Sequence, residues 1–248
     1  MFRRRRSEPA PPGEDEIVDR VLCIAVTAML GAVLANLREG ALDDGKAAQY
    51  ATEAHRWLRR ENLADSLSAR ERALVAKPLE EWSEQEAIDV GWGNESAGVF
   101  LWAISAVDGL PPYDTRFESL PSLVPLLAPT ADFRQAARLR PAEGIARARD
   151  LAELWNWRSR TTKLQLDGDR QAEGIDLDAV ARQSATLAHA EGSIPAPIDG
   201  DFPAYGKAYR DLDDDEYANA TSIAMQRHRA FNWLCGSASD WDNVPTDT

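Results

Sequence analysis

The chain has 248 residues and a net charge of −13, because 28 Lys and Arg stand against 41 Asp and Glu. A surface this acidic repels polyanions and anionic lipid headgroups over most of its area, so the composition argues against nucleic acid and membrane surfaces as partners. Hydrophobic residues make up 44% of the chain and include eight tryptophans, which is enough for the core of a globular protein.

The N-terminal segment 1–14 combines four successive arginines at positions 3–6 with a Pro-rich run. This composition cannot bury apolar surface, and it predicts a disordered basic tail. We expect residues 15–248 to form a single helical domain.

The two cysteines, Cys23 and Cys235, lie in apolar surroundings without a Cys or His at metal-ligand spacing. They indicate reduced, buried thiols, and hence a cytoplasmic protein.

Residues 21–37 form a long uncharged run that imitates a signal anchor. Acidic residues at positions 14, 15, 16 and 19 precede it, whereas a signal peptide carries positive charge there. The run is also diluted by alanine, glycine and polar residues. We therefore predict a buried helix over 15–38 that ends before Gly40, and a membrane helix is the alternative.

The next helices are predicted from their caps. The second begins after Asp43 and carries one apolar face at the spacing typical of a helix, made by Ala47, Ala51, Ala54 and Leu58. The segments 68–71 and 83–86 both have the Ser-x-x-Glu pattern of a capping box, and we expect each of them to open a short helix.

The central stretch of the chain is 91–108, GWGNESAGVFLWAISAVD, in which Glu95 is the one charge before Asp108. A helix over these residues is apolar on every side, which is typical of a helix in the middle of a protein. We predict a buried central helix here, capped by Asn94 and stopped by residues 109–112, as the core of an all-α fold.

Two long irregular loops are expected at 110–130, which holds five prolines, and at 193–212, which is rich in Pro and Gly and has room for a small hairpin. A turn is expected at 166–170. Helical segments are predicted between these loops and after them, over 130–139, from Pro141 onward, 176–192 and 217–235.

Arg227 falls inside the apolar face of the last predicted helix when its residues are placed at about 100° per step. Arginine keeps its charge when it is buried, so it needs a carboxylate partner. The candidates are Glu95, Asp242 and Asp247. Arg227 is then either half of a structural ion pair between core helices or a binding group for an anionic ligand. Glu95 is correspondingly either that partner, an acid that favours the helix dipole, or a catalytic carboxylate.

The C-terminal segment brings Asp240, Asp242 and Asp247 near His228 in the sequence. Three acids and a histidine can hold a divalent metal or perform acid/base chemistry. Their spacing fits no EF-hand, and aspartates in turns more often bond to their own backbone. We therefore expect caps and an anchored tail, with no metal and no cofactor. The chain also contains no P-loop, Rossmann glycine set, G-x-S-x-G or H-E-x-x-H.

The C-terminal sequence is GDFPAYGKAYRDL followed by MQRHRAFNWLCGSASDWDNVPTDT. It resembles the C-terminal signature of the bacterial family described as domain of unknown function 4272. That signature is a helix with Arg-His-Arg-Ala and Asn-Trp-Leu, then Trp-Asp and a terminal Thr-Asp-Thr, which match 227–230, 232–234, 241–242 and 246–248 here. The resemblance extends over 15–248, through WGNESAGVFLWAISAVDGLPP and LRPAEGIARARDLAELWNWR. Gln226 departs from it where an acid is usual. The resemblance implies a soluble, mostly helical bacterial protein and no particular activity.

The candidate binding or core ion-pair site comprises Glu95, Arg227, His228, Asn232, Asp240, Trp241, Asp242 and Asp247. The first hypothesis is a non-enzymatic binding or interaction protein, with a protein partner or a second copy of the chain, whose tail closes over the core. The alternative is a metal-assisted or acid/base hydrolase-like enzyme that uses Glu95, His228 and the C-terminal Asp cluster. The enzyme needs these groups to converge on a pocket that solvent reaches, whereas the binding protein needs only an apolar pocket or groove.

Overall fold

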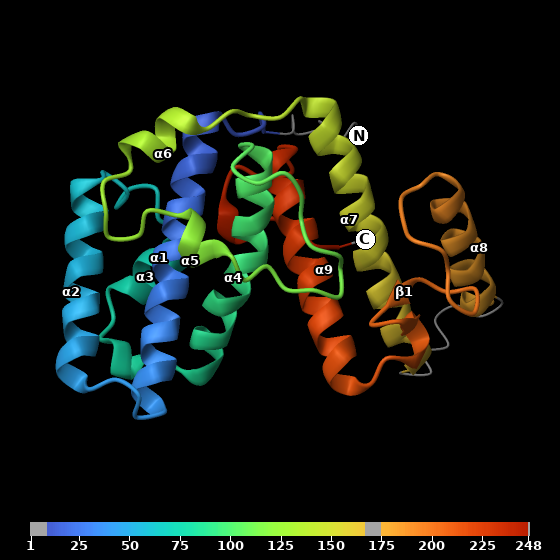
Figure 1. The fold of residues 1–248 in the computed structure, drawn as a ribbon, viewed down its shortest axis with the longest axis horizontal. Coiled ribbons are helices and arrows are strands. Elements are labelled where there is room, and N and C mark those ends of the chain that lie inside the picture. The colour runs from blue at the N-terminus through green and yellow to red at the C-terminus, as the bar shows by residue number, and fades with distance from the viewer. Residues whose placement is uncertain (1–8, 167–174, 248) are drawn as a thin grey trace, which may run out of the picture.

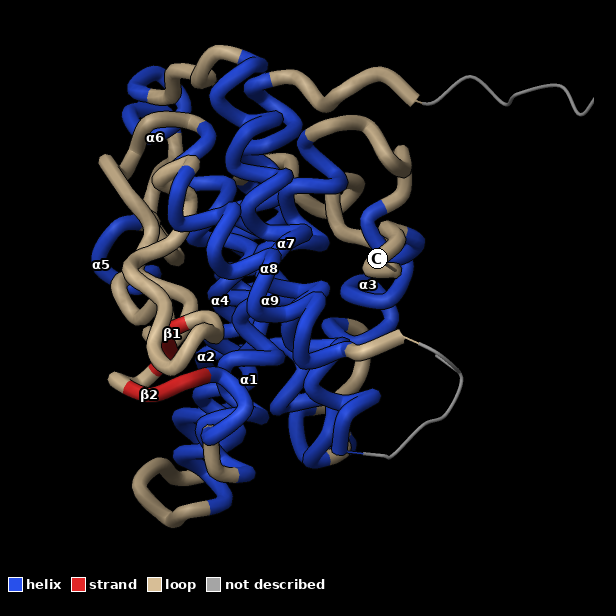
Figure 2. Tube along the Cα trace, turned by 90° about the vertical axis from the view of Figure 1, so that its right-hand side faces the viewer, coloured by secondary structure: helices blue, strands red, loops and turns tan. Residues whose placement is uncertain are grey.

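The computed structural model describes residues 9–166 and 175–247, and the regular secondary structure of this part is helical apart from one short hairpin (Figures 1 and 2). The α-helices are α1 (Glu14–Arg38), α2 (Asp44–Arg60), α3 (Ala69–Val75), α4 (Glu84–Ala103), α5 (Leu120–Leu123), α6 (Ala131–Ala136), α7 (Ala142–Leu166), α8 (Leu177–Ala190) and α9 (Asp214–Leu234). The hairpin pairs β1 (Pro203–Ala204) with β2 (Lys207–Ala208), and the 3-10 turns are η1 (Leu79–Glu81), η3 (Tyr209–Asp211) and η4 (Trp241–Asn243). The predicted all-α fold is confirmed.

Four long helices form the body of the molecule, in which α1 packs on α4, α4 on α9, and α9 on α7. In Figure 1 α2 lies outside α1 and α8 lies outside α7, at opposite ends of this row. The C-terminal half of α4 is buried on all sides, since residues 95–101 are all buried. The apolar sequence of this helix therefore fits its central place between two neighbours.

Helix α1 is long and apolar enough to cross a membrane by length and composition alone. In the fold, 83% of its most apolar window is buried inside the protein. The apolar residues of α1 thus form part of the protein core, where they pack mainly on α4. A core helix of a soluble protein passes the composition test equally well, so the burial favours the predicted core helix.

The predicted buried central helix is present, but its bounds differ from 91–108. Ser83 caps it, and the Ser83–Glu86 box opens one continuous helix of 20 residues that ends at Ala103. A separate short helix after Ser83, and an N-cap at Asn94, are therefore wrong. Gly93 tolerates the helix interior because it lies against α1, where a Cβ would stand 2.9 Å from the Cγ2 atom of Ile24. The glycine serves close helix packing here rather than a helix end.

The segment predicted over 130–139 is helical only in α6, which ends at Ala136. Three other helix starts follow the predicted caps. Asp43 caps α2, Ser68 caps α3 and Asp213 caps α9, each by accepting a backbone N–H of the first turn. The loop 110–130 holds only the short α5, and 193–212 holds the hairpin. The turn expected at 166–170 lies outside the described residues beyond position 166.

The N-terminal tail was expected to be disordered over 1–14, and its residues 1–8 lie outside the described part of the chain. Residues 9–13 are described, and they pass over the end of α9. Gly236 stands there with a φ of +79°, and a Cβ on it would lie 2.5 Å from the carbonyl oxygen of Pro9. The last part of the tail is therefore seated on the domain.

Candidate functional site

Arg227 lies on α9 and is wholly buried at 0% exposure, and its partner Glu95 on α4 is 1% exposed. Nε of Arg227 donates to Oε2 of Glu95 at 2.9 Å, and Nη2 forms an ion pair with the same oxygen at 2.9 Å. Of the three acids that the sequence offered, Glu95 is therefore the partner. The other oxygen of Glu95, Oε1, accepts the backbone N–H of Phe117 at 2.7 Å.

The remaining donors of Arg227 all go to one loop. Nη1 donates to the carbonyl oxygens of Pro111 and Pro112 at 2.6 and 3.2 Å, and Nη2 donates to that of Thr115 at 3.0 Å. All three nitrogens of the guanidinium thus bond within the protein. Arg227 on α9 and Glu95 on α4 together hold the loop 110–117 against these two helices, which lie side by side in Figure 1.

A second buried pair joins α7 to the segment before the hairpin, and the sequence analysis missed it. Nε and Nη2 of Arg158 donate to Oδ1 and Oδ2 of Asp201 at 2.7 and 2.6 Å, and both side chains are at most 1% exposed. Asp201 also accepts the N–H groups of Phe202 and Arg210. Burial alone would raise the pKa of Asp201, but the bonds from Arg158 outweigh it and lower that pKa. Arg158 lies three residues after Trp155, so a wheel of α7 could have revealed a buried arginine.

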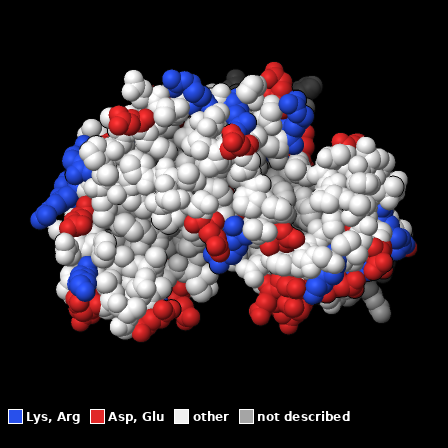
Figure 3. All heavy atoms as spheres, viewed as in Figure 1, with Lys and Arg blue, Asp and Glu red and all other residues white. Residues whose placement is uncertain are grey.

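Between these two fastened segments lies a cavity of about 580 Å³, within the range of small-molecule sites. Its walls are the loop 110–114 on one side and residues 193–195 and 203–206 on the other, over a floor from α7 and α9. The lining residues are Trp102, Leu110, Pro111, Pro112, Tyr113, Asp114, Ala148, Leu151, Trp155, Ser193, Pro195, Pro203, Ala204, Gly206, Arg227 and Phe231. In Figure 3, viewed as in Figure 1, the surface between the helical body and the α8 end is mostly free of charged side chains.

Aromatic rings that contact one another line the inside of this cavity. Tyr113 stacks on Trp155 with ring centroids 5.0 Å apart and an interplanar angle of 9°. The guanidinium of Arg227 lies 4.9 Å from the centroid of the Tyr113 ring, on which it makes a cation–π contact. Trp102 meets Phe231 edge to face at 5.6 Å. Burial raises the pKa of Tyr113, which therefore stays a neutral phenol.

Asp114 links the two walls of the cavity. Its Oδ2 accepts the backbone N–H of Tyr205 at 2.8 Å. Tyr205 and Gly206 form the hairpin turn with φ values of +52° and +74°, the left-handed pair typical of a type I′ turn. The loop fastened by Arg227 is thus tied to the hairpin that is fastened through Asp201.

His228 serves to anchor the C-terminal tail. Its two ring nitrogens lie 3.2 Å from Nδ2 of Asn156 and 3.0 Å from Nδ2 of Asn232. These two amides also donate to the carbonyl oxygens of Thr246 and Pro245. Burial lowers the pKa of His228, which favours the neutral ring.

The tail acids divide between a local cap at Asp240 and a long-range contact of Asp242 with α3. Asp242 accepts from the hydroxyl of Ser68 and the N–H of Arg70, both at 2.8 Å, at the start of α3. Asp240 caps η4 by accepting the N–H of Asp242. Asp247 is exposed.

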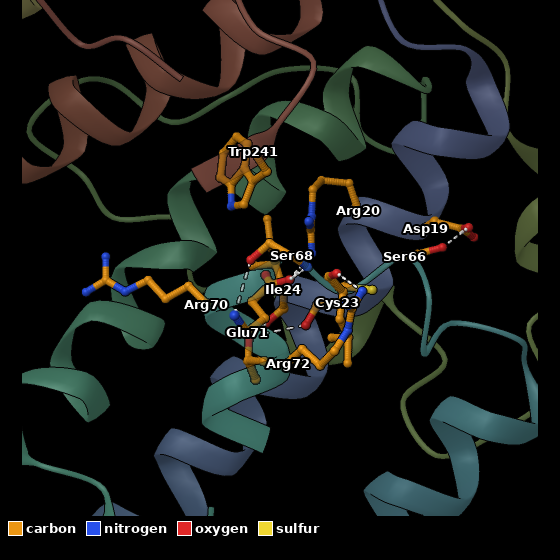
Figure 4. A network of polar contacts seen from close by, with 12 residues as sticks. Asp19, Arg20, Cys23, Ile24, Ser66, Ser68, Arg70, Glu71, Arg72 and Trp241 are labelled. Carbon is orange, nitrogen blue, oxygen red and sulfur yellow. Dashed lines mark hydrogen bonds and ion pairs between the residues drawn. The ribbon is translucent and has the colours of Figure 1, made fainter. Parts of the chain in front are cut away.

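Trp241 packs against the Phe100 ring at 5.5 Å, and it covers the network in which Arg20 of α1 donates to Glu71 of α3 (Figure 4). Glu95, His228 and the tail acids therefore belong to separate networks. Among the residues that the structure describes, no group of three or more His, Cys, Asp or Glu could hold a metal ion.

Together, these features define an all-α protein of one domain with an apolar cavity beside its two central ion pairs. The chain belongs to the family described as domain of unknown function (DUF4272), whose model matches residues 2–188. The C-terminal residues that carry the resemblance in the sequence lie beyond this match. No curated protein and no solved structure matches the chain.

Proposed function

We propose that this bacterial, cytoplasmic protein is a non-enzymatic binding domain that holds a small, mainly apolar ligand in the cavity between the loop 110–114 and the hairpin. The observation that carries the proposal is the construction of the walls. The loop 110–117 hydrogen-bonds to both members of the Arg227–Glu95 pair, and Arg158 on α7 pairs with Asp201 before the hairpin. The side chains of both ion pairs are at most 1% exposed. A cavity whose walls are fixed in advance binds without the entropic cost of ordering them.

The lining favours an apolar ligand. Among the described residues that line the cavity, only Asp114 and Arg227 are charged, and all three guanidinium nitrogens of Arg227 bond to acceptors within the protein. Trp102, Tyr113 and Trp155 supply large rigid surfaces, which small-molecule sites commonly use.

The hydrolase-like alternative has less support. Glu95 bonds to Arg227 and Phe117, so it has no free position towards a substrate. His228 faces two amides, and Asp242 bonds to Ser68 and Arg70 at the start of α3, which leaves the proposed acid/base groups apart. A cytoplasmic location is supported by the free thiols of Cys23 and Cys235.

The neutral fluorescent probe N-phenyl-1-naphthylamine tests this proposal. We expect one saturable site per chain on the wild type. Ala148→Trp should abolish it, because Ala148 lines the cavity and an indole fills the space beside Leu151. Ala146→Trp is the matched control, since Ala146 is exposed on the same helix and does not line the cavity. The proposal is wrong if the wild type does not bind the probe, or if all three proteins bind it equally.

A further inference from the structure

We propose that the ligand of this cavity is an organic cation, an amine whose ammonium group meets Asp114 and whose apolar body lies among the rings. This inference rests on the proposed function, since it names the class of ligand for the same cavity. It follows from the charges of the lining and from the bonds that Asp114 makes.

The charges of the lining do not cancel. The positive charge of Arg227 is matched by Glu95, at 2.9 Å. Asp114 accepts from two neutral donors, the N–H of Tyr205 at 2.8 Å and the hydroxyl of Thr115 at 3.1 Å. Within residues 9–166 and 175–247, the ion pairs of the structure do not include Asp114. The cavity is therefore left with one uncompensated negative charge on its wall.

A carboxylate in such surroundings favours a cationic ligand. Asp114 is partly buried, and most of its neighbours in the cavity are aliphatic or aromatic. Water screens a charge less effectively there than on an open surface, so an ammonium group gains more from the contact. Each carboxylate oxygen can accept two hydrogen bonds, so Asp114 has capacity left for a ligand N–H.

The rings of the cavity already bind cations within the protein. The guanidinium of Arg227 lies over Tyr113, and that of Arg140 lies 4.8 Å from the centroid of Trp102. Arg140 does not oppose a second cation strongly, because its guanidinium is only partly buried and bonds to the carbonyls of Trp102 and Val107. Rings of this kind also stabilise an alkylammonium group, at a face that no arginine covers.

Three ligands that share a naphthyl ring and differ in charge distinguish the effect of charge from that of apolar contact. They are 1-naphthylmethylamine, 1-naphthylmethanol and 1-naphthoate. Each is titrated against the bound N-phenyl-1-naphthylamine at neutral pH and low salt. We expect the amine to displace the probe at about tenfold lower concentration than the alcohol, and the carboxylate to be the weakest. The advantage of the amine should shrink as salt is added, whereas the affinity of the alcohol should not.

Asp114→Asn is the decisive variant, because its amide oxygen can still accept the Tyr205 N–H and keep the walls joined. It should bind the probe and the alcohol as the wild type does, and lose the preference for the amine. Asp108→Asn is the control, since Asp108 is exposed, precedes the same loop and does not line the cavity.

An amine preference that survives Asp114→Asn, or a wild type that binds amine and alcohol equally, would overturn the inference and leave the proposed function standing. Absence of probe binding to the wild type would refute the proposed function itself. If Asp114→Asn loses all binding, the titrations of the wild type with the three naphthyl ligands decide whether the cavity prefers a cation. A preference for the amine that shrinks with salt supports the inference, and equal binding of amine and alcohol overturns it.

Discussion

Removal of Arg227 should be far more damaging than removal of any exposed arginine. Arg227→Met keeps the apolar length of the side chain, but it strands Glu95, which is 1% exposed. It also leaves the carbonyls of Pro111, Pro112 and Thr115 without their donor. Loss of one partner of a buried pair costs about 3–5 kcal/mol. A domain of this size loses about 2–4 °C in Tm per kcal/mol, so Tm should fall by about 6–20 °C.

The assay is urea and thermal denaturation followed by far-UV circular dichroism. Arg147→Met is the matched control, because Arg147 is exposed on α7 and should change the stability by less than about 0.5 kcal/mol. Glu95→Gln keeps an acceptor for the Phe117 N–H, so the double variant Arg227→Met/Glu95→Gln should lose at least about 1 kcal/mol less than the two single losses together. A single-variant loss below about 1 kcal/mol, or strictly additive losses, would refute the structural role of the pair.

Two further predictions concern a glycine of α4 and the buried histidine. Gly98→Ala should destabilise the protein by about 1–3 kcal/mol, because a Cβ there would lie 2.6 Å from the ring of the buried Phe117. Gly91→Ala in the same helix is the control, because a Cβ there meets nothing within 4 Å, and it should raise the free energy of unfolding by about 0.5–1 kcal/mol. Equal urea midpoints for the two variants would contradict the packing of α4. Burial lowers the pKa of His228 in the folded state. As the pH falls below about 6.5, His228 therefore takes up a proton in the unfolded chain before it does so in the folded protein. The free energy of unfolding decreases over this range, down to the folded-state pKa. The His228→Gln variant should therefore show a flatter dependence of this free energy on pH between about 7 and 5, measured by urea denaturation at successive pH values, and an unchanged slope would exclude a depressed pKa.

The helices were predictable where local sequence decides them. The caps at Asp43, Ser68 and Asp213 satisfy backbone donors through residues only three positions away, and so they are visible in the sequence. The continuation of the helix that Ser83 opens into the central stretch was not predictable, because Gly91 and Gly93 weaken a helix by propensity alone. Tertiary packing of Gly93 against α1 outweighs that local preference, and no local pattern reports it.

The candidate site divides in the same way. The sequence placed Glu95 among three candidate partners of Arg227, because the central stretch offers a single acid before Asp108, and the structure selects it. Asp201 could not be predicted as the partner of Arg158, since it stands in a loop among many acids and its burial depends on how the hairpin folds onto α7. The cavity joins the loop 110–114, the floor from α7 and the segment 193–206, which periodicity cannot bring together. Asp114 therefore seemed an ordinary loop acid.

The most direct test of the account concerns the second ion pair, because neither Arg158 nor Asp201 lines the cavity. The double variant Arg158→Met/Asp201→Asn removes both charges and keeps an acceptor for the Phe202 N–H. If the buried pairs fix the walls, this variant should stay folded below its melting transition and bind N-phenyl-1-naphthylamine at least about tenfold more weakly than the wild type. Wild-type affinity in a folded variant without the pair would contradict the claim that these ion pairs build the site.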